Sequence, residues 1–208
     1  MRNFIKHFAE KWLRYLIALI LIFIFWLVII DTLVAVKPEH KLGIFIGAFG
    51  ISPKLEECIE KPSKIEEIEI LDVNINEDYY FVIFSAYASS GDFDFSIINE
   101  QQFRESDIQY YLVLDEQKLI NYFGEQEYYC VNDQLYGIKI YDGKTQTGIL
   151  SDAIIYGLEG QTDDYYLFFH KKSTHLGDLN SSADDKAIQT IKNILNKYNI
   201  GENSNENK

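Results

Sequence analysis

YLIALILIFIFWLVII, residues 15–30, holds sixteen residues without a charged side chain. Asp31 and Thr32 interrupt the apolar run, and residues 33–36 continue it. As a helix, the 22 residues of 15–36 would be about 33 Å long, enough to cross a hydrocarbon core of about 30 Å. Because neither Gly nor Pro breaks the stretch, we expect a transmembrane helix over residues 15–36, with the lipid bilayer as its surroundings.

Two other structures are compatible with such a stretch. A cleaved signal peptide has a shorter apolar region followed by small residues at the cleavage site, whereas here the large Leu33 stands two positions before Ala35. A buried core helix is the other alternative, although a helix that is apolar all round is unusual at an N-terminus. The length of the apolar stretch and the residues that flank it together favour a membrane anchor.

The flanking charges predict the orientation of this anchor. Positive charge is retained on the cytoplasmic side of a membrane helix. Four basic side chains precede the apolar stretch and two follow it closely: Arg2, Lys6, Lys11 and Arg14, then Lys37 and Lys41. We therefore expect a cytoplasmic basic leader over 1–14, a single-pass protein of the cell membrane, and an extracytoplasmic C-terminal domain.

The net charge of −13 is an average over two unlike parts. Residues 1–37 carry five basic and two acidic side chains, a net charge of +3, and the remaining residues carry −16. An acidic body with a sequence pI near 4.7 lacks the basic face that phosphates require, so a nucleic-acid partner is not expected. A hydrophobic fraction of 47% excludes a disordered acidic chain, and two cysteines exclude a disulfide-dense scaffold.

Beyond the anchor, turn-forming residues separate segments with strand-like composition. Residues 37–53 are expected to be a connector, whose apolar LGIFIGAFGI is too short to span and lies at the membrane surface or tucks into the domain. A short helix begins near Ser52-Pro53, and another is possible over 116–123. Segments rich in β-branched and aromatic residues predict strands at 65–73, 78–88, 93–98, 108–115, 126–131, 134–141, 147–157 and 164–171.

The C-terminal region has the pattern of an amphipathic helix. Apolar residues from Ala187 to Tyr198 recur at three- and four-residue steps, and Gly201 is a plausible end. Residues 201–208, rich in Asn and Glu, are expected to be a disordered tail. The predicted fold class is α+β: an N-terminal transmembrane helix and then a domain over 54–200, in which the C-terminal helix packs on a mostly antiparallel sheet.

Four Tyr-Tyr pairs open strand-like segments. In a strand, adjacent side chains point to opposite faces, so each pair would direct one ring inward and one outward. Outward tyrosines are enriched at binding surfaces, although tyrosine also simply favours strands. The candidate binding surface comprises Tyr79, Tyr80, Tyr110, Tyr111, Tyr128, Tyr129, Tyr165 and Tyr166.

The chain has two cysteines, Cys58 and Cys130. A disulfide between them is chemically permitted outside the cytoplasm and would close a loop of about 70 residues, worth about 4 kcal/mol in the chain-entropy model. Two buried free thiols are the alternative, because a sequence cannot show whether the two Cα atoms are within reach of each other.

Residues with possible catalytic chemistry are few. Asp92 and Asp94 would share one strand face, and His170 and His175 lie close in sequence, but neither set matches a known metal or hydrolase motif. There is no Gly-rich phosphate loop and no GxSxG or CxxC motif, so we expect no catalytic, cofactor or metal residues. An envelope hydrolase with an atypical acidic or histidine site remains the alternative function. The leading expectation is an anchored binding domain of accessory, inhibitor or immunity type, whose acidic body favours a basic protein partner.

Overall fold

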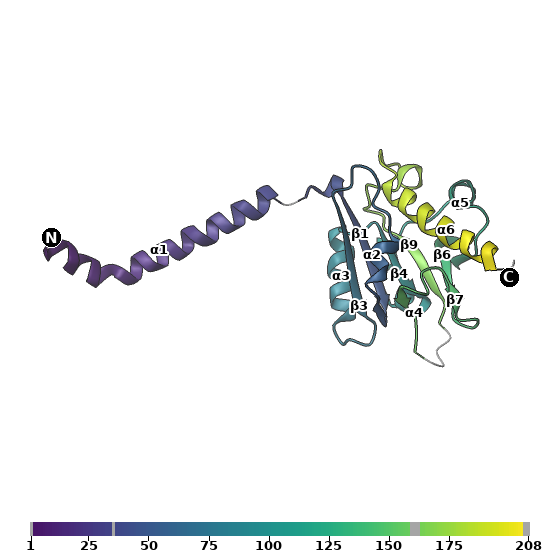
Figure 1. Ribbon diagram of the computed structural model, residues 1–208, viewed down its shortest axis with the longest axis horizontal. Coiled ribbons are helices and arrows are strands. Elements are labelled where there is room, and N and C mark those ends of the chain that lie inside the picture. The colour runs from purple at the N-terminus through teal and green to yellow at the C-terminus, as the bar shows by residue number, and fades with distance from the viewer. Residues whose placement is uncertain (1, 35, 159–162, 206–208) are drawn as a thin grey trace. The chain divides into compact units, whose positions relative to one another are not determined.

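The computed structural model describes the chain except residues 1, 35, 159–162 and 206–208 (Figure 1). It separates into two compact units, Met1–Lys37 and Pro38–Lys208. The expected boundary of the folded domain at residue 54 therefore lies too late in the chain, since the second unit already begins at Pro38.

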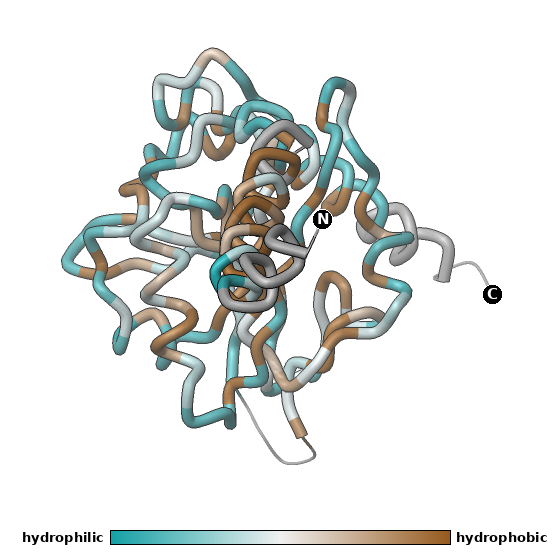
Figure 2. Tube along the Cα trace, turned by 90° about the vertical axis from the view of Figure 1, so that its left-hand side faces the viewer, coloured by the Kyte–Doolittle hydropathy of each residue, from teal (hydrophilic) through white to brown (hydrophobic). Residues whose placement is uncertain are grey.

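The first unit consists of one helix, α1 (Arg2–Val34). Its segment Lys11–Ile30 is long and apolar enough to cross a membrane, and none of that window is buried inside the structure. Brown turns, which mark hydrophobic residues, predominate along the described part of this helix in Figure 2. The helix begins at Arg2, so the basic leader is part of it rather than a separate segment. Val36 lies beyond its end, and residue 35 is outside the described residues.

The second unit is an α+β domain built on a mixed, mostly antiparallel sheet. Within the described residues the strand order is β3-β1-β4-β9-β6-β5, with β7 added beside β6. Strand β1 is parallel to β3 and to β4, and every other pairing in this sheet is antiparallel. The bounds are β1 (Lys41–Ala48), β3 (Glu67–Asn74), β4 (Phe95–Asn99), β5 (Tyr128–Val131), β6 (Gln134–Asp142), β7 (Thr147–Gly148) and β9 (Tyr165–Phe169). A separate two-stranded pair joins β2 (Gly50–Ile51) to β8 (Ile154–Ile155).

Helices lie on both faces of this sheet. The alternation of side chains along β1 sends Leu42, Ile44 and Ile46 into one core cluster and Phe45 into the other. The first cluster is covered by α2 (Lys54–Cys58), α5 (Glu116–Phe123) and α6 (Lys186–Asn205). The second is covered by α3 (Tyr80–Ser90) and α4 (Glu100–Glu105). Three 3-10 turns, η1 (Pro38–His40), η2 (Ile108–Tyr110) and η3 (Gly177–Leu179), complete the described elements.

The connector expected over 37–53 is instead the structural centre of the domain. Strand β1 occupies its middle and lies between β3 and β4, with seven of its eight residues buried. A strand covered on both faces needs no polar side chains, so it reads as an unbroken apolar run. That composition left two alternatives open, a segment at the membrane surface or one that tucks into the domain, and the structure shows the second.

Two predicted strands are not strands. Residues 78–88 contain most of α3, because Tyr80, Phe84 and Ala88 recur every four residues and are all buried on one helix face. The helix ends at Gly91, whose φ of 85° is the left-handed conformation that glycine adopts readily. Residues 108–115 form η2 and only isolated bridges, Tyr111 to His170 and Leu114 to Leu135.

The remaining predictions of elements fit the structure closely. Helix α5 has the expected bounds, and β3, β4, β5, β6 and β9 overlap the predicted strands. Segment 147–157 holds two short strands, β7 and β8, rather than one. The turn Asn132-Asp133 joins β5 to β6 with positive φ at both residues, the geometry of a tight hairpin. Helix α6 extends past Gly201 to Asn205, within the stretch expected to be a tail, and 206–208 lie outside the described residues.

Candidate functional site

Most of the paired tyrosines belong to the core. Tyr165 and Tyr166 are 0% and 7% exposed, because β9 lies inside a sheet that is covered on both faces. Tyr79 is 52% exposed and is the one clearly solvent-facing ring of the eight. The pairs therefore do not form the expected shared surface. Tyr80, Tyr111 and Tyr129 are buried, and Tyr110 and Tyr128 are half-buried.

The two cysteines do not form a disulfide in this structure. Cys58 is on α2 and is buried in the core cluster that also contains α6. Cys130 is exposed on β5, an edge strand at the opposite end of the strand order from β3. A side chain buried under a helix and one exposed at a distant edge do not offer the short Cβ separation that the bond requires.

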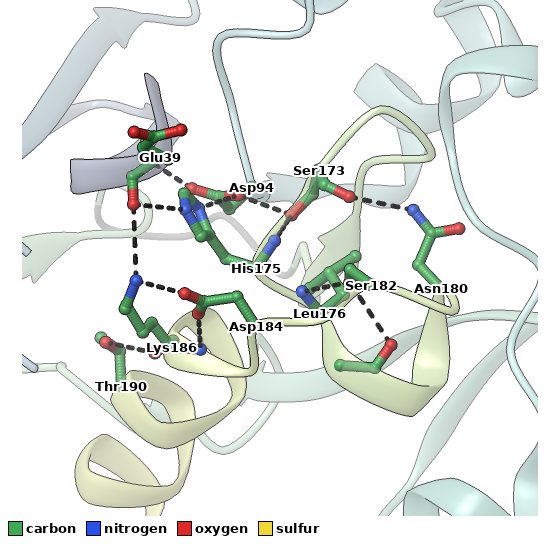
Figure 3. Close-up of polar contacts among 12 residues, drawn as sticks. Glu39, Asp94, Ser173, His175, Leu176, Asn180, Ser182, Asp184, Lys186 and Thr190 are labelled. Carbon is green, nitrogen blue, oxygen red and sulfur yellow. Dashed lines mark hydrogen bonds and ion pairs between the residues drawn. The ribbon is translucent and has the colours of Figure 1, made fainter. Parts of the chain in front are cut away.

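Three of the four residues of the hydrolase alternative lie inside the domain, and Figure 3 shows two of them, Asp94 and His175, in contact. Asp94 immediately precedes β4 and is 5% exposed. Its carboxylate accepts three hydrogen bonds. The donors are the Gly43 backbone N–H at 2.9 Å, the Ser173 hydroxyl at 2.5 Å and His175 Nδ1 at 3.0 Å. Asp92, in contrast, is exposed on the surface.

His175 connects this carboxylate to the start of the domain. Burial alone would lower the pKa of His175, but the hydrogen bond and charge of Asp94 outweigh it and raise that pKa. The protonated ring has two N–H donors, one for Asp94 and one for the Glu39 carbonyl oxygen, 3.4 Å from Nε2. Lys186 on α6 donates to the same carbonyl and pairs with Asp184 (Figure 3). The network thereby ties η1, β1, the loop before η3 and α6 together.

His170 lies beside this network and is buried completely. Desolvation lowers the pKa of His170 to about 4, so the ring is neutral at physiological pH. Its Nε2 bonds the Ser96 hydroxyl, and its ring packs against Phe93 and Tyr111. Its Nδ1 has no hydrogen-bond partner within the described part of the chain. With exposures of 1% for His170 and 3% for His175, no substrate reaches either ring, and the arrangement is that of an interior polar network.

A pocket of about 230 Å³ opens elsewhere, at the carboxyl ends of the parallel strands. Phe49 follows β1, Ile75 follows β3, and Asn99 ends β4. The chain leaves β1 towards α2 on one sheet face and leaves β4 towards α4 on the other. Ligands in open α/β sheets bind at such divergence points, outside the carboxyl ends of the strands. The other lining residues are Asn76, Tyr80, Phe81, Gln101, Gln102, Glu105 and Asp163.

Two of the lining residues carry a polar atom that is buried away from solvent and has no hydrogen-bond partner among the described residues, Tyr80 Oη and Gln102 Nε2. Tyr80 is 2% exposed and Gln102 is 5% exposed, and burial raises the pKa of the Tyr80 phenol. Both atoms lie over Gly47 of β1, where an added Cβ would stand 2.5 Å from Oη and 2.8 Å from Nε2. Glycine at this position therefore leaves room for the two polar groups.

Helix α4 fixes the direction of the Gln102 amide. Asn99 caps the helix by accepting from the Gln102 backbone N–H, and Gln102 Oε1 accepts from the Asn99 backbone N–H, both at 2.8 Å. With Oε1 used in this capping box, Nε2 must point the other way. This site was not predicted from the sequence, although Asn99 followed three residues later by Gln102 is a capping-box signature.

Among the described residues, no group of three or more His, Cys, Asp or Glu side chains is placed to hold a metal ion. Comparison with known proteins found no match to this chain among family models, curated proteins or solved structures.

Proposed function

We propose that this chain is a single-pass membrane protein whose acidic C-terminal domain acts by binding a basic protein. The distribution of charge carries the proposal: the net charge is +3 over residues 1–37 and −16 over the rest of the chain. An apolar segment such as Lys11–Ile30, with none of its window buried in the structure, is unfavourable in water and favourable in lipid. The basic residues before it favour a cytoplasmic N-terminus and an extracytoplasmic domain.

The rim of the pocket is the part of the domain best suited to such a partner. Exposed apolar side chains stand beside it at the start of α3: Tyr79, Phe81 and Val82 are 52%, 39% and 71% exposed. Exposed carboxylates of Glu77 and Asp78 precede them in the chain. Apolar groups bordered by negative charge suit a partner that offers lysine or arginine around an apolar centre.

The anchor and its orientation are tested by fractionation and by a reporter. We expect the full chain to stay with membranes after alkaline extraction, and a reporter fused after Lys208 to be active only outside the cytoplasm. A reporter active only in the cytoplasm would refute the orientation, and release by alkali would refute the anchor.

The partner is tested by crosslinking in cells, followed by identification of the crosslinked protein. We expect a partner with a basic surface whose crosslinking is lost when Glu77 and Asp78 are replaced by lysine. The matched control replaces Glu56 and Glu57, another exposed acidic pair, which lies on α2 on the other side of the sheet, and it should retain the partner. An equal effect of the two double variants, or an acidic partner, would contradict the proposal.

The hydrolase alternative gains no support from this geometry. Asp94, His170 and His175 converge, but they do so in the interior, and Asp92 is apart from them. Their contacts account for the packing of the domain rather than for a reaction.

A further inference from the structure

We propose that the pocket at the ends of β1 and β4 binds one arginine side chain of the basic partner protein. This inference rests on the proposed function and names the group by which the partner is held. The charge of the lining carries it: Glu105 of α4 and Asp163 contribute two carboxylates, and none of the described residues lining the pocket is Lys, Arg or His. The pocket therefore offers negative charge that its own lining does not neutralise.

Both carboxylates are positioned by neutral groups and are open to solvent. Gln101 Nε2 donates to Glu105 Oε1 at 2.8 Å, and Asn99 Nδ2 donates to Asp163 Oδ2 at 3.3 Å. These amides orient the carboxylates without compensating their charge. Since the side chains of Glu105 and Asp163 are exposed, a cation entering the pocket from solvent can reach both.

The rest of the accessible lining favours a guanidinium over an ammonium group. The ring of Phe81 is 39% exposed and that of Phe49 is half-buried, and guanidinium groups stack on aromatic rings. The exposed amides of Asn76 and Gln101 add further polar atoms. A guanidinium spreads five N–H donors over one plane and can pair with acceptors on several sides, whereas an ammonium is compact and more strongly hydrated.

The size and the surroundings of the pocket fit a side chain that a protein presents. At about 30 Å³ per water molecule, 230 Å³ holds roughly eight waters, about the number of non-hydrogen atoms in an arginine side chain. Tyr79 and Val82, 52% and 71% exposed, stand beside the pocket and would contact the apolar surface around that arginine. The exposed carboxylates of Glu77 and Asp78 extend the negative charge beyond the pocket.

The test measures binding of Nα-acetyl-arginine amide to the full chain in a non-ionic detergent, by ligand-observed NMR and calorimetry. The matching lysine derivative has the same charge, and the citrulline derivative has the shape of arginine without its charge. We expect the arginine derivative to bind saturably with a Kd of about 1–10 mM. The lysine derivative should bind about fivefold more weakly or less, and the citrulline derivative should not bind. Added salt should weaken the binding of arginine.

Variants locate the binding. Glu105→Gln and Asp163→Asn remove the charges but keep the oxygens that accept from Gln101 and Asn99. We expect each to weaken arginine binding about threefold or more, and the double variant about tenfold or more. Glu56→Gln, on α2 on the other side of the sheet, changes the net charge by the same amount as either single variant and should bind like the wild type. Because all the replaced side chains are exposed, the urea midpoints of unfolding should not change.

The Glu105→Gln/Asp163→Asn variant is also compared with the wild type by crosslinking in cells, where we expect it to lose the basic partner. A partner that this variant retains, but that is lost when Glu77 and Asp78 are replaced by lysine, would overturn the arginine site and leave the proposed function standing. Selective arginine binding without any basic partner in cells would refute the proposed function and support the site. Equal binding of the arginine and citrulline derivatives, preference for lysine, or equal binding by wild type and double variant would overturn the inference.

Discussion

At the level of single residues, Asp94 shows how one carboxylate organises the interior of this domain. It accepts from a strand backbone, a loop hydroxyl and a histidine ring, so the cost of burying its charge is offset by three donors. Two residues away, Asp92 has the same side chain and is exposed. The sequence GDFDF predicts that the two aspartates share a strand face but cannot tell which one is buried, because burial depends on loop 171–185 folding back over β4.

Replacing Asp94 therefore has a large predicted effect. In Asp94→Asn the amide cannot accept from all three donors, and at least one buried donor loses its partner. We expect a loss of about 2–4 kcal/mol in the free energy of unfolding, measured by urea denaturation. The control, Asp92→Asn, should change it by less than about 0.5 kcal/mol. Equal effects of the two substitutions would show that Asp94 is not the organising group.

His170 predicts a pH dependence of stability. Its pKa is about 4 in the folded domain and about 6.5 when unfolded, so between these values only the unfolded chain takes up the proton. Stability should therefore fall by up to about 3 kcal/mol as the pH decreases from 6.5 to 4. His175 affects stability in a different pH range, because its pKa is raised in the folded domain. The stability that its protonated ring contributes is fully present below pH 6.5 and is lost as the pH rises through the pKa of the folded state.

Urea denaturation at several pH values isolates the His170 contribution by difference. The variant Ser96→Ala/His170→Phe replaces both hydrogen-bonded partners by apolar groups. It should lose less stability in acid than the wild type. Parallel stability curves for the two proteins between pH 6.5 and 4 would refute the assignment to His170.

At the level of elements, the errors of sequence interpretation have a common cause. Strand β1 and helix α3 are both apolar, and both were interpreted from their composition. The segment of β1 was taken as a connector too short to span a membrane, and the segment of α3 was taken as a strand because it is rich in strand-forming residues. Their true states are set by tertiary contacts, since Phe45 of β1 packs against Phe84 of α3 at 4.8 Å between ring centroids. Surface elements with polar signals, such as α5 with its capping Asp115, are predicted well.

The close approach of β1 to the residues that precede β4 provides a test of the observed pairing. A Cβ on Gly43 would stand 1.9 Å from the Asp92 carbonyl oxygen, a backbone atom that cannot swing aside. Gly43→Ala should therefore cost about 3 kcal/mol or more, measured by thermal or urea unfolding. Gly50→Ala, whose nearest neighbour is an Ile155 methyl at 3.8 Å, should be tolerated. Equal tolerance of both alanines would contradict the placement of β1.

At the level of the whole molecule, the sequence divides correctly into an apolar helix and an acidic domain, because length, hydropathy and charge are summed over many residues. The boundary between the two parts could not be predicted in this way. The composition of residues 37–53 does not indicate that this segment pairs with other strands, whereas the structure places Lys41–Ala48 in the centre of the sheet. The pocket could not be predicted from the sequence for the same reason, since its lining comes from segments far apart in the chain, among them the residues after β1 and β3, α3 and α4.

Two fragments distinguish these boundaries. The fragment 38–208 contains every strand of the described sheet and should unfold cooperatively in urea, with strand and helix signals in circular dichroism. The fragment 54–208 lacks β1, so β3 loses its partner and β4 loses one of two neighbours. It also lacks Gly43 N–H and the Glu39 carbonyl, which bind Asp94 and His175. We expect it to show no cooperative transition; a transition matching that of 38–208 would mean that β1 is dispensable, and the domain would then begin near residue 54.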